Sequence, residues 1–295
     1  MLKQEDTTEI TVLCEPSEEQ LAETKKVFEE AEIECPPNQP DLKKLLKEYT
    51  LDAAFIITPH KFHHDQTVAC LEAGLDVLLE KPMVMNAMEA VSLIDVMNKT
   101  GRLFVIAFPG SLSPNIRKAI NQLRSGELGK LLTISATVWQ NWREATIGKW
   151  RQVPEISGGG FLFDTGAHML NTVVDLAGEE FEEVSAYFDY RGCEVEINAT
   201  INGKLESGAM VTMHGMGDAV KHNCKSMIQV FTEKSILNTG VWGERLEMQK
   251  EGETHLSTVE VPESLGVWQQ FLAVRRGEIP NPCPPEVGLR MAKLY

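Results

Sequence analysis

Hydrophobic and polar positions follow two different patterns along the chain, and the change comes near residue 130. In the first 107 residues, short apolar runs of strand type are separated by segments with helical spacing. A continuous apolar run such as AAFIIT is typical of a strand buried on both faces. Strands alternating with helices predict right-handed crossovers and a parallel sheet with helices on both faces. The expected strands cover residues 9–14, 53–58, 75–79 and 102–108.

The helices of this first part are marked by residues that start or stop them. Ser17-Glu18-Glu19-Gln20 is a capping box that opens one helix, and leucines at helical spacing mark a short second helix over 42–49. A third helix stops at Gly74, because glycine readily takes the left-handed conformation that ends helices. A fourth begins at an Asn86 cap and runs to about residue 99.

Beyond residue 130, runs of strand type are joined by turns, with little helix between them. This pattern favours a largely antiparallel sheet. One helix-like segment, 160–176, interrupts it. The change of pattern predicts two domains, residues 1–108 and 109–295. The strand-like runs of the second part are 130–139, 183–190, 194–203, 206–215, 225–233 and 246–252.

Composition narrows the class of protein. The chain has 295 residues, 43% of them hydrophobic and 24% charged, which is ordinary for a globular protein. A net charge of −15 argues against nucleic acid or an anionic membrane surface as a partner. The six cysteines show no CxxC or metal-ligand spacing, which is typical of a reducing compartment. No apolar run approaches a membrane span, and the first nine residues lack the apolar segment of a signal peptide, so the cytoplasm is the expected location.

A lysine follows one of the buried strands directly, in the stretch Glu80-Lys81-Pro82. Proline restricts the residue before it to extended conformations, so the backbone of Lys81 is unusually fixed. Fixing a charged side chain at this position is useful if its ammonium group must point at a ligand.

Two other segments leave strands at the same edge, where open parallel sheets bind their ligands. In CEPS, Glu15 stands where a carboxylate can take both hydroxyls of an adenosine ribose, although a solvated loop acid explains it equally well. In TPHKFHHD, three histidines lie close together, at 60, 63 and 64. A polar helix start explains them better than a metal site, because no Cys, Asp or Glu at ligand spacing accompanies them.

The helix-like segment of the second part carries a polar stripe. Three glycines, 158–160, let the backbone approach a ligand or a neighbouring strand closely. Asp164, His168 and Asn171 then follow at i, i+4 and i+7, on one face of a helix. The residues between them are mostly apolar, which indicates a buried helix rather than an exposed polar face. A carboxylate that orients an imidazole suits proton transfer. Asp175 lies about 16 Å further along and is left out of the site.

The order of these segments resembles the glucose–fructose oxidoreductase/inositol dehydrogenase/rhizopine-catabolism (Gfo/Idh/MocA) oxidoreductases. The matching pieces are TPHKFHHDQTVACLEAGLDVLLEKP, SGELGKL and WRQVPEISGGGFLFDTGAHMLN. The resemblance implies a Rossmann-type nucleotide-binding domain over 1–108 and an α/β substrate and oligomerisation domain over 109–295. The second domain is expected to hold a large open-faced, mainly antiparallel sheet through which copies associate as dimers or tetramers.

The resemblance also assigns roles to single residues. Lys81 matches the lysine that contacts substrate and nicotinamide, while Asp164 and His168 match the acid and the proton-relaying histidine. Asn171 takes a place often held by Asp; with Lys81 and His168 it is an expected substrate contact. Glu15 matches the acidic residue that favours NAD over NADP. The remaining positions that line the cofactor cleft are matched by Thr58, Pro59, His63 and Glu80.

Two departures from the family pattern affect these expectations. Nothing before Glu9 corresponds to the first strand and the G-x-G-x-x-G turn that binds the pyrophosphate. The nucleotide-binding domain is therefore expected to be incomplete in these 295 residues, and their affinity for NAD to be low. The stretch 109–111 is Pro-Gly-Ser where relatives often have arginine or asparagine, which makes an acidic or phosphorylated substrate less expected.

The leading hypothesis is an NAD-dependent dehydrogenase that transfers a hydride between the cofactor and a hydroxyl-bearing carbon of a sugar or polyol, with no metal ion. A glycoside-cleaving relative that uses NAD transiently is an alternative. A non-catalytic homologue that has lost cofactor binding is another.

Overall fold

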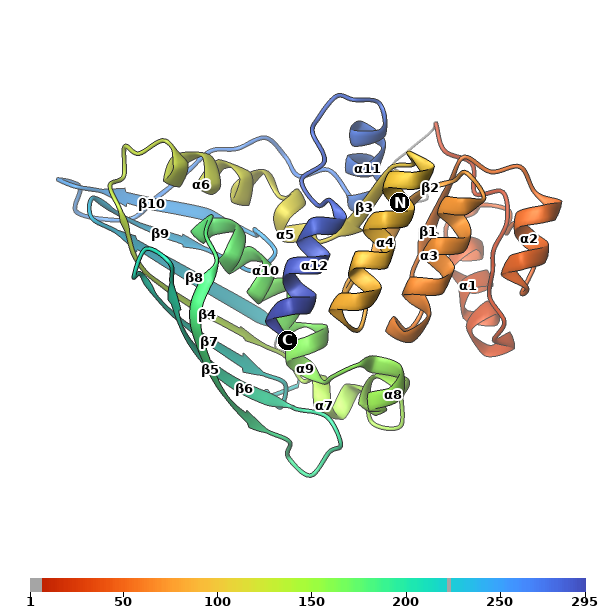
Figure 1. Ribbon diagram of the computed structural model, residues 1–295, viewed down its shortest axis with the longest axis horizontal. Helices are drawn as coiled ribbons and strands as arrows, with labels where there is room; N and C mark the ends of the chain where they lie inside the picture. Colours follow the sequence, from red (N-terminus) through yellow and green to blue (C-terminus); the bar gives the residue numbers. More distant parts are fainter. Residues whose placement is uncertain (1–6, 222–223) are drawn as a thin grey trace.

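The computed structural model describes residues 7–221 and 224–295. Within this part of the chain, the strands form a small parallel sheet and a large, mostly antiparallel one, with helices between them (Figure 1). The expectation that the chain starts without a signal peptide falls partly on residues 1–6, which lie outside the described residues.

The parallel sheet has three described strands in the order β1-β2-β3, and both pairs are parallel. Their side chains form the first core: Val77, Leu78 and Leu79 have no exposed surface. The apolar runs of β2 and β3 therefore mark strands buried on both faces, as predicted. The same prediction is wrong for the run 53–58, because β1 is mostly only partly buried and Ile57 just after it is 66% exposed. The bounds are Ala53–Ile56 (β1), Asp76–Glu80 (β2) and Phe104–Ala107 (β3).

The helices of this domain begin and end where the capping signals placed them. The Ser17 side chain accepts a hydrogen bond from the backbone N–H of Gln20, and Asn86 does the same for Glu89. Gly74 has a left-handed φ of 89° just after the third helix. The elements are α1 (Glu18–Glu30), α2 (Leu42–Glu48), η1 (His60–Phe62), α3 (His63–Glu72) and α4 (Ala87–Thr100).

The prediction of a strand over residues 9–14 is wrong. Its only pairing among the described residues is an isolated parallel bridge between Leu13 and Asn38, with Leu13 N–H donating to the Pro37 carbonyl at 2.9 Å. A strand needs a ladder of backbone hydrogen bonds. The described neighbour of β1 is β2 alone, so residues 8–12 have no partner strand along their length.

The large sheet has the described order β11-β10-β9-β8-β4-β7-β6-β5 and confirms the mainly antiparallel prediction. The exception is the central pair β4 and β7, which runs parallel. The short strands β9 and β11 were not predicted. The bounds are Leu131–Trp139 (β4), Phe181–Asp189 (β5), Asn198–Leu205 (β6), Met210–Met216 (β7), Lys225–Thr232 (β8), Ser235–Thr239 (β9), Leu246–Lys250 (β10) and Ser257–Thr258 (β11).

Helices cover one face of the large sheet, while the other face is bare in Figure 1. The alternation along β7 agrees, because Val211 and Met213 are buried whereas Met210 and Met216 are exposed. The covering and connecting helices are α5 (Pro109–Leu112), α6 (Pro114–Arg124), α7 (Trp142–Ala145), η2 (Trp150–Gln152), α8 (Pro154–Ser157), α9 (Phe161–Asp164) and α10 (Gly166–Ala177).

The last two helices, α11 (Val267–Arg275) and α12 (Pro285–Leu294), return to the parallel sheet. Trp268 of α11 stacks on Phe55 of β1, with ring centroids 6.2 Å apart. Between the two helices, the Cys283 carbonyl accepts a hydrogen bond from Ile106 of β3 at 3.0 Å. This segment therefore joins the two domains, and the boundary at residue 108 stays a prediction.

No helix in the described part of the chain is both long and apolar enough to cross a membrane.

Candidate functional site

The segments that leave β1 and β2 are tied together by one histidine. The ring nitrogens of His63 lie 2.8 Å from the carbonyl oxygens of Thr58 and Pro82, and the residue has no exposed surface. His63 therefore lies against both loops and holds the backbone next to the cis peptide Lys81–Pro82 in place. The resemblance placed His63 in the cofactor cleft, whereas the structure buries it beneath the two loops.

The glycine triplet brings α9 against the segment before β6. The carboxylate of Glu196 accepts hydrogen bonds from the backbone N–H of Gly160 at 2.7 and 2.8 Å, and from Phe163 at 3.2 Å. A Cβ atom at Gly160 would overlap the backbone oxygen of Glu196. The predicted close approach is therefore real, and Glu196 satisfies the free N–H groups at the start of the helix that carries Asp164.

Asp164 is the centre of a charged cluster. The Lys81 ammonium donates to its Oδ1 at 2.5 Å and to its backbone carbonyl at 2.9 Å. Trp142 Nε1 and Arg151 Nε donate to Oδ2 at 2.9 and 3.1 Å. Burial alone would raise the pKa of Asp164, but Lys81 and the Trp142 hydrogen bond hold it below its ordinary range. Asp164 is thus an anion at neutral pH and fixes the ammonium group of Lys81.

The sequence predicted that Asp164 would orient His168, and this is wrong in the structure. Asp164 ends α9, α10 starts at Gly166, and both carboxylate oxygens are occupied by other partners. Neither nitrogen of His168 has a hydrogen-bond partner among the described residues, and Nδ1 is fully buried. The ring lies between those of Phe108 and Trp242, each with its centroid 5.8 Å away.

The environment of His168 keeps the imidazole neutral. Burial, and then the charge of Lys81, lower its pKa well below the ordinary value. A neutral imidazole is able to accept a proton, which the charged form is not.

Asn171 is buried and hydrogen-bonded within the protein. It has no exposed surface, its amide N–H donates to Ser111 Oγ at 2.7 Å, and its oxygen accepts from Arg290 at 3.2 Å. Arg290 and Ser111 also bond the two oxygens of Asp175, at 2.6 and 2.5 Å. One N–H and the oxygen of the amide are therefore used within the protein, in a network that joins α5, α10 and α12, and the role of Asn171 as a substrate contact stays a prediction.

The other expected cofactor residues are spread along the edge of the sheet. Glu15 accepts from the backbone N–H of Ser17 at 2.8 Å, and Thr58 donates to Gln66 at 2.6 Å. Pro59 opens η1. Glu80 follows the core of β2, where burial raises its pKa. The structure brings Glu80 and Lys81 together, while Glu15 and Thr58 are engaged locally.

The three clustered histidines face different partners. His60 Nδ1 lies 2.6 Å from the Ser157 carbonyl, and its ring packs edge-on against Trp150. His64 lies beside Asp65 and Ser92 instead. Across the described residues, no group of three or more His, Cys, Asp or Glu is placed to hold a metal ion.

Sequence reasoning gave no role to Trp142, Arg151, Trp242 or Arg290. Trp142 lies in α7 and Arg151 in η2, which are too short, at four and three residues, to show an apolar period, so their contact with Asp164 had no signal in the sequence. Arg290 and Trp242 reach the site from positions more than 70 residues further along the chain than His168.

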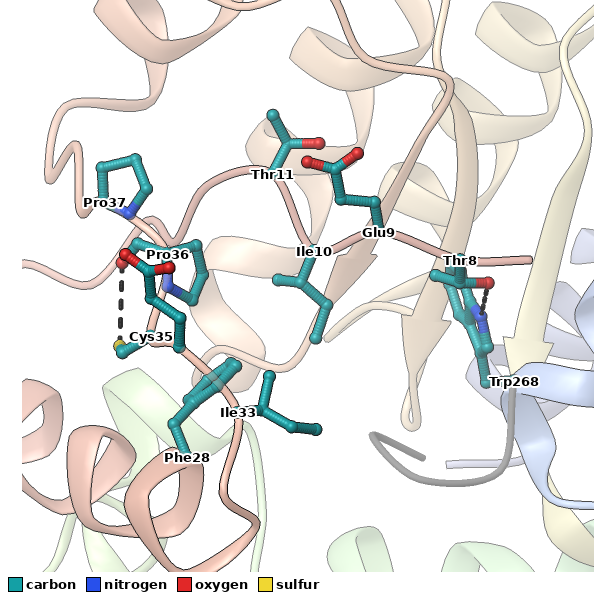
Figure 2. A pocket seen from close by; sticks show the side chains of 11 residues that line it. Thr8, Glu9, Ile10, Thr11, Phe28, Ile33, Cys35, Pro36, Pro37 and Trp268 are labelled. Atoms are coloured by element: carbon teal, nitrogen blue, oxygen red, sulfur yellow. Dashed lines mark hydrogen bonds between the residues drawn. The ribbon is translucent and has the colours of Figure 1, made fainter. Parts of the chain in front are cut away.

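A cavity of about 430 Å³ lies apart from this cluster, between residues 8–11, the segment after α1, and α11 (Figure 2). Figure 2 shows Ile10, Phe28 and Ile33 lining it, with Trp268 Nε1 donating to Thr8 Oγ1 at 2.9 Å. It shares no residue with the Lys81 cluster.

Buried neutral histidines should make the fold sensitive to acid. Burial lowers the pKa of His60 to about 3, and it also lowers the pKa values of His63 and His168. Below about pH 6.5 the unfolded chain binds protons that the folded chain does not, so the free energy of unfolding decreases as the pH is lowered. Each histidine lowers the free energy of unfolding by up to about 1.4 kcal/mol for each pH unit of acidification. Glu80, whose pKa is raised, has the opposite effect on the free energy of unfolding. We expect Tm to fall steadily between pH 7 and pH 5.

Differential scanning calorimetry across this range checks the expectation. His60→Gln should flatten the slope of Tm against pH, whereas the exposed His255→Gln should leave it unchanged. A Tm that is constant from pH 7 to pH 5 would contradict the neutral state of these histidines.

Comparison with protein families gives two matches. Residues 1–108 match an oxidoreductase family with an NAD-binding Rossmann fold, and residues 116–238 match the GFO/IDH/MocA C-terminal domain.

Several characterised proteins share part of this sequence. Levoglucosan dehydrogenase of Pseudarthrobacter phenanthrenivorans is 26% identical over 148 residues, which cover 50% of this chain and 38% of that protein. D-glucoside 3-dehydrogenase of Escherichia coli is 28% identical over 140 residues, covering 47% and 39%. An NADP(+)-dependent scyllo-inositol 2-dehydrogenase of Bacillus subtilis is 24% identical over 156 residues, covering 53% and 42%. The matched segments thus span less than half the length of each of these relatives.

Solved structures resemble almost the whole fold. The aldose-aldose oxidoreductase of Caulobacter crescentus, in complex with glycerol, superposes with a TM-score of 0.80 at 21% identity, over 97% of this chain and 87% of the other. Levoglucosan dehydrogenase with NADH and levoglucosan gives 0.80 at 19% identity, over 96% and 85%. These likenesses confirm the predicted fold, a Rossmann-type domain joined to an open-faced sheet.

Proposed function

Because the chain belongs to the Gfo/Idh/MocA family of oxidoreductases, we propose that it transfers a hydride between a nicotinamide cofactor and a hydroxyl-bearing carbon of a sugar or polyol. The observation that carries the proposal is the position of Lys81. It leaves β2 at the carboxyl edge of the parallel sheet, where such sheets bind their ligands, and Asp164 holds its ammonium group in place.

The ammonium group of Lys81 has one donor to spare. It carries three N–H donors, and the side chain and carbonyl of Asp164 accept two of them. The third is available to a substrate oxygen. A cation fixed before the substrate arrives stabilises the alkoxide that develops when the hydroxyl loses its proton.

His168 is the proposed proton acceptor. Its lowered pKa keeps it neutral, and neither ring nitrogen is engaged by a described residue. In the oxidative direction the hydroxyl proton passes to the imidazole while Lys81 holds the oxygen, and water later removes the proton. Asp164 contributes through Lys81 rather than through His168. The nicotinamide, when bound, supplies the acceptor for the hydride.

The residues present fit parts of a nicotinamide dinucleotide. Thr58, Pro59, Glu80 and Lys81 lie where β1 and β2 end, and the carboxylate of Glu15 suits ribose hydroxyls, which supports NAD over NADP. The described residues place no glycine-rich strand-to-helix turn at this sheet. Low NAD affinity of residues 1–295 therefore stays a prediction, and assays need millimolar cofactor.

A dehydrogenase assay tests the proposal. The 295-residue chain is incubated with NAD or NADP and a panel of pyranoses, inositols and acyclic polyols, and reduced cofactor is followed at 340 nm. We expect NADH to accumulate with at least one panel member. Loss of a glycoside without net NADH would favour the transient-cofactor alternative. No reduction of either cofactor at millimolar concentration with any panel member, together with no thermal shift, would favour a non-catalytic chain.

The bare face of the large sheet supports self-association, which we include in the proposal. Tyr187, Met210 and Met216 on exposed strand positions are 76%, 63% and 44% accessible. Exposed apolar surface of this kind marks interaction sites. Light scattering should give a dimer or tetramer, and Tyr187→Glu should shift the equilibrium toward the monomer.

The six free cysteines support the cytoplasm as the location of the protein.

A further inference from the structure

A tryptophan beside His168 belongs to neither the charged cluster nor the cofactor edge. Trp242 lies in the turn between β9 and β10, and its ring is tilted by 58° to the imidazole, with the centroids 5.8 Å apart. It reaches His168 from the large sheet, on the domain opposite to Lys81. Trp242 is therefore adjacent to the imidazole that is the proposed proton acceptor.

The turn that carries Trp242 is held by hydrogen bonds from the helices on one side. Thr172 Oγ1 donates to the Val241 carbonyl at 2.8 Å. The Gly243 carbonyl accepts from Asn115 Nδ2 at 2.9 Å and from Ser113 Oγ at 3.1 Å. Both carbonyls flanking Trp242 are therefore fixed by side chains of α10 and of the start of α6.

Hydrogen bonds also hold the turn from the sheet side. The backbone N–H of Trp242 donates to Glu244 at 3.2 Å, and that of Val241 donates to Ser226 Oγ at 2.9 Å. Ser226 in turn donates to Glu244 at 2.8 Å. The backbone under the indole is thus fixed before any ligand arrives, so little entropy is lost when the ring contacts one.

The indole ring of Trp242 has both surface and a donor that a ligand could use. Trp242 is partly exposed, and its Nε1–H donates to no described residue. A buried tryptophan that only fills a core usually finds a partner for this N–H. Trp268, which is partly buried like Trp242, has such a partner in the same chain, because its Nε1–H donates to Thr8.

We propose that Trp242 is the surface on which the substrate ring stacks, and that it selects cyclic sugars or cyclitols over open-chain polyols. The proposal rests on the proposed dehydrogenase function and refines its substrate class. One face of a pyranose or cyclitol presents several C–H bonds together, which pack against an aromatic ring, while its hydroxyls point sideways toward donors such as the indole N–H. An open chain offers no such face.

The test compares Trp242→Ala and Trp242→Phe with the wild type. Loss of an aromatic contact should raise KM for the cyclic substrate about fivefold to tenfold and leave kcat within about twofold. Trp242→Phe, which keeps a ring but no N–H, should recover most of the affinity. KM for an acyclic polyol of equal carbon number should not change in either variant. An equal rise for cyclic and acyclic substrates would overturn the proposal, as would unchanged KM values in Trp242→Ala.

Direct binding separates this proposal from the proposed function. Saturation-transfer NMR with the same cyclic and acyclic compounds reports binding without turnover, and circular dichroism shows whether each variant is folded. Cyclic compounds that bind the wild type but not Trp242→Ala, without any cofactor reduction, would uphold the stacking role and refute the dehydrogenase. Cofactor reduction that is unaffected by Trp242→Ala would uphold the dehydrogenase function and refute the stacking role.

Discussion

Replacing Lys81 by alanine is expected to lower kcat about 100- to 1,000-fold while changing NAD affinity only a few-fold. The ammonium group is the cation that meets the developing alkoxide, and loss of one preorganised donor of this kind has effects of that size. The fold should survive, because Asp164 keeps its hydrogen bonds from Trp142 and Arg151. Steady-state kinetics and a cofactor titration measure the two effects separately.

Two further variants sharpen this test. Lys81→Arg should not restore activity, since a planar guanidinium cannot take the place of a compact ammonium held at 2.5 Å from Asp164 Oδ1. Lys61→Ala removes an exposed lysine of η1 and serves as the matched control with full activity. A kcat of Lys81→Ala within threefold of the wild type would assign the chemistry to another group.

Replacing His168 by asparagine is expected to lower kcat about 100- to 10,000-fold and to remove one limb of the pH profile. In the oxidative direction the imidazole must be neutral to accept the proton. Activity therefore rises with pH through the pKa of His168 and is constant above it. Because burial and Lys81 lower this pKa well below its ordinary value, the rising limb should lie below pH 6.5, and activity at pH 7 should already be at its plateau.

Acid unfolding must be kept apart from this limb. Enzyme held at each pH and then assayed at pH 7.5 reports the fraction that stays folded, and only the remaining pH dependence belongs to catalysis. Asparagine approximates the size of the imidazole, so a folded, inactive variant is expected. If the limb persists in His168→Asn, the ionisation belongs to a different residue, with Glu80 as the first to examine.

The sequence correctly predicted the elements that local patterns determine, which are apolar runs and helix caps. The apolar runs of β2 and β3 and the caps at Ser17 and Asn86 lie where the sequence placed them. The same local signals placed Lys81 at the end of a buried strand and Asp164 in a buried helix. These features depend on neighbours only a few residues away.

Features that depend on distant partners were missed. The segment 9–14 has the residues of a strand, but a strand forms only beside a partner, and no periodicity reveals whether one is present. The sequence paired Asp164 with His168 because they are one helical turn apart. In the structure Asp164 instead bonds Lys81, 83 residues earlier, because two opposite charges in a buried place neutralise each other.

The parallel contact between β4 and β7 has a consequence for how the protein folds. It closes a loop over residues 140–209, and Asp164, His168 and the Gly160–Glu196 junction all lie inside that loop. Contacts between residues so far apart in sequence form late and slowly. We therefore expect the pairing of β4 with β7 and the packing of this loop, which carries the site, to be coupled during folding. Substitutions that loosen the Gly160–Glu196 junction should therefore reduce the yield of folded protein before they reduce its turnover.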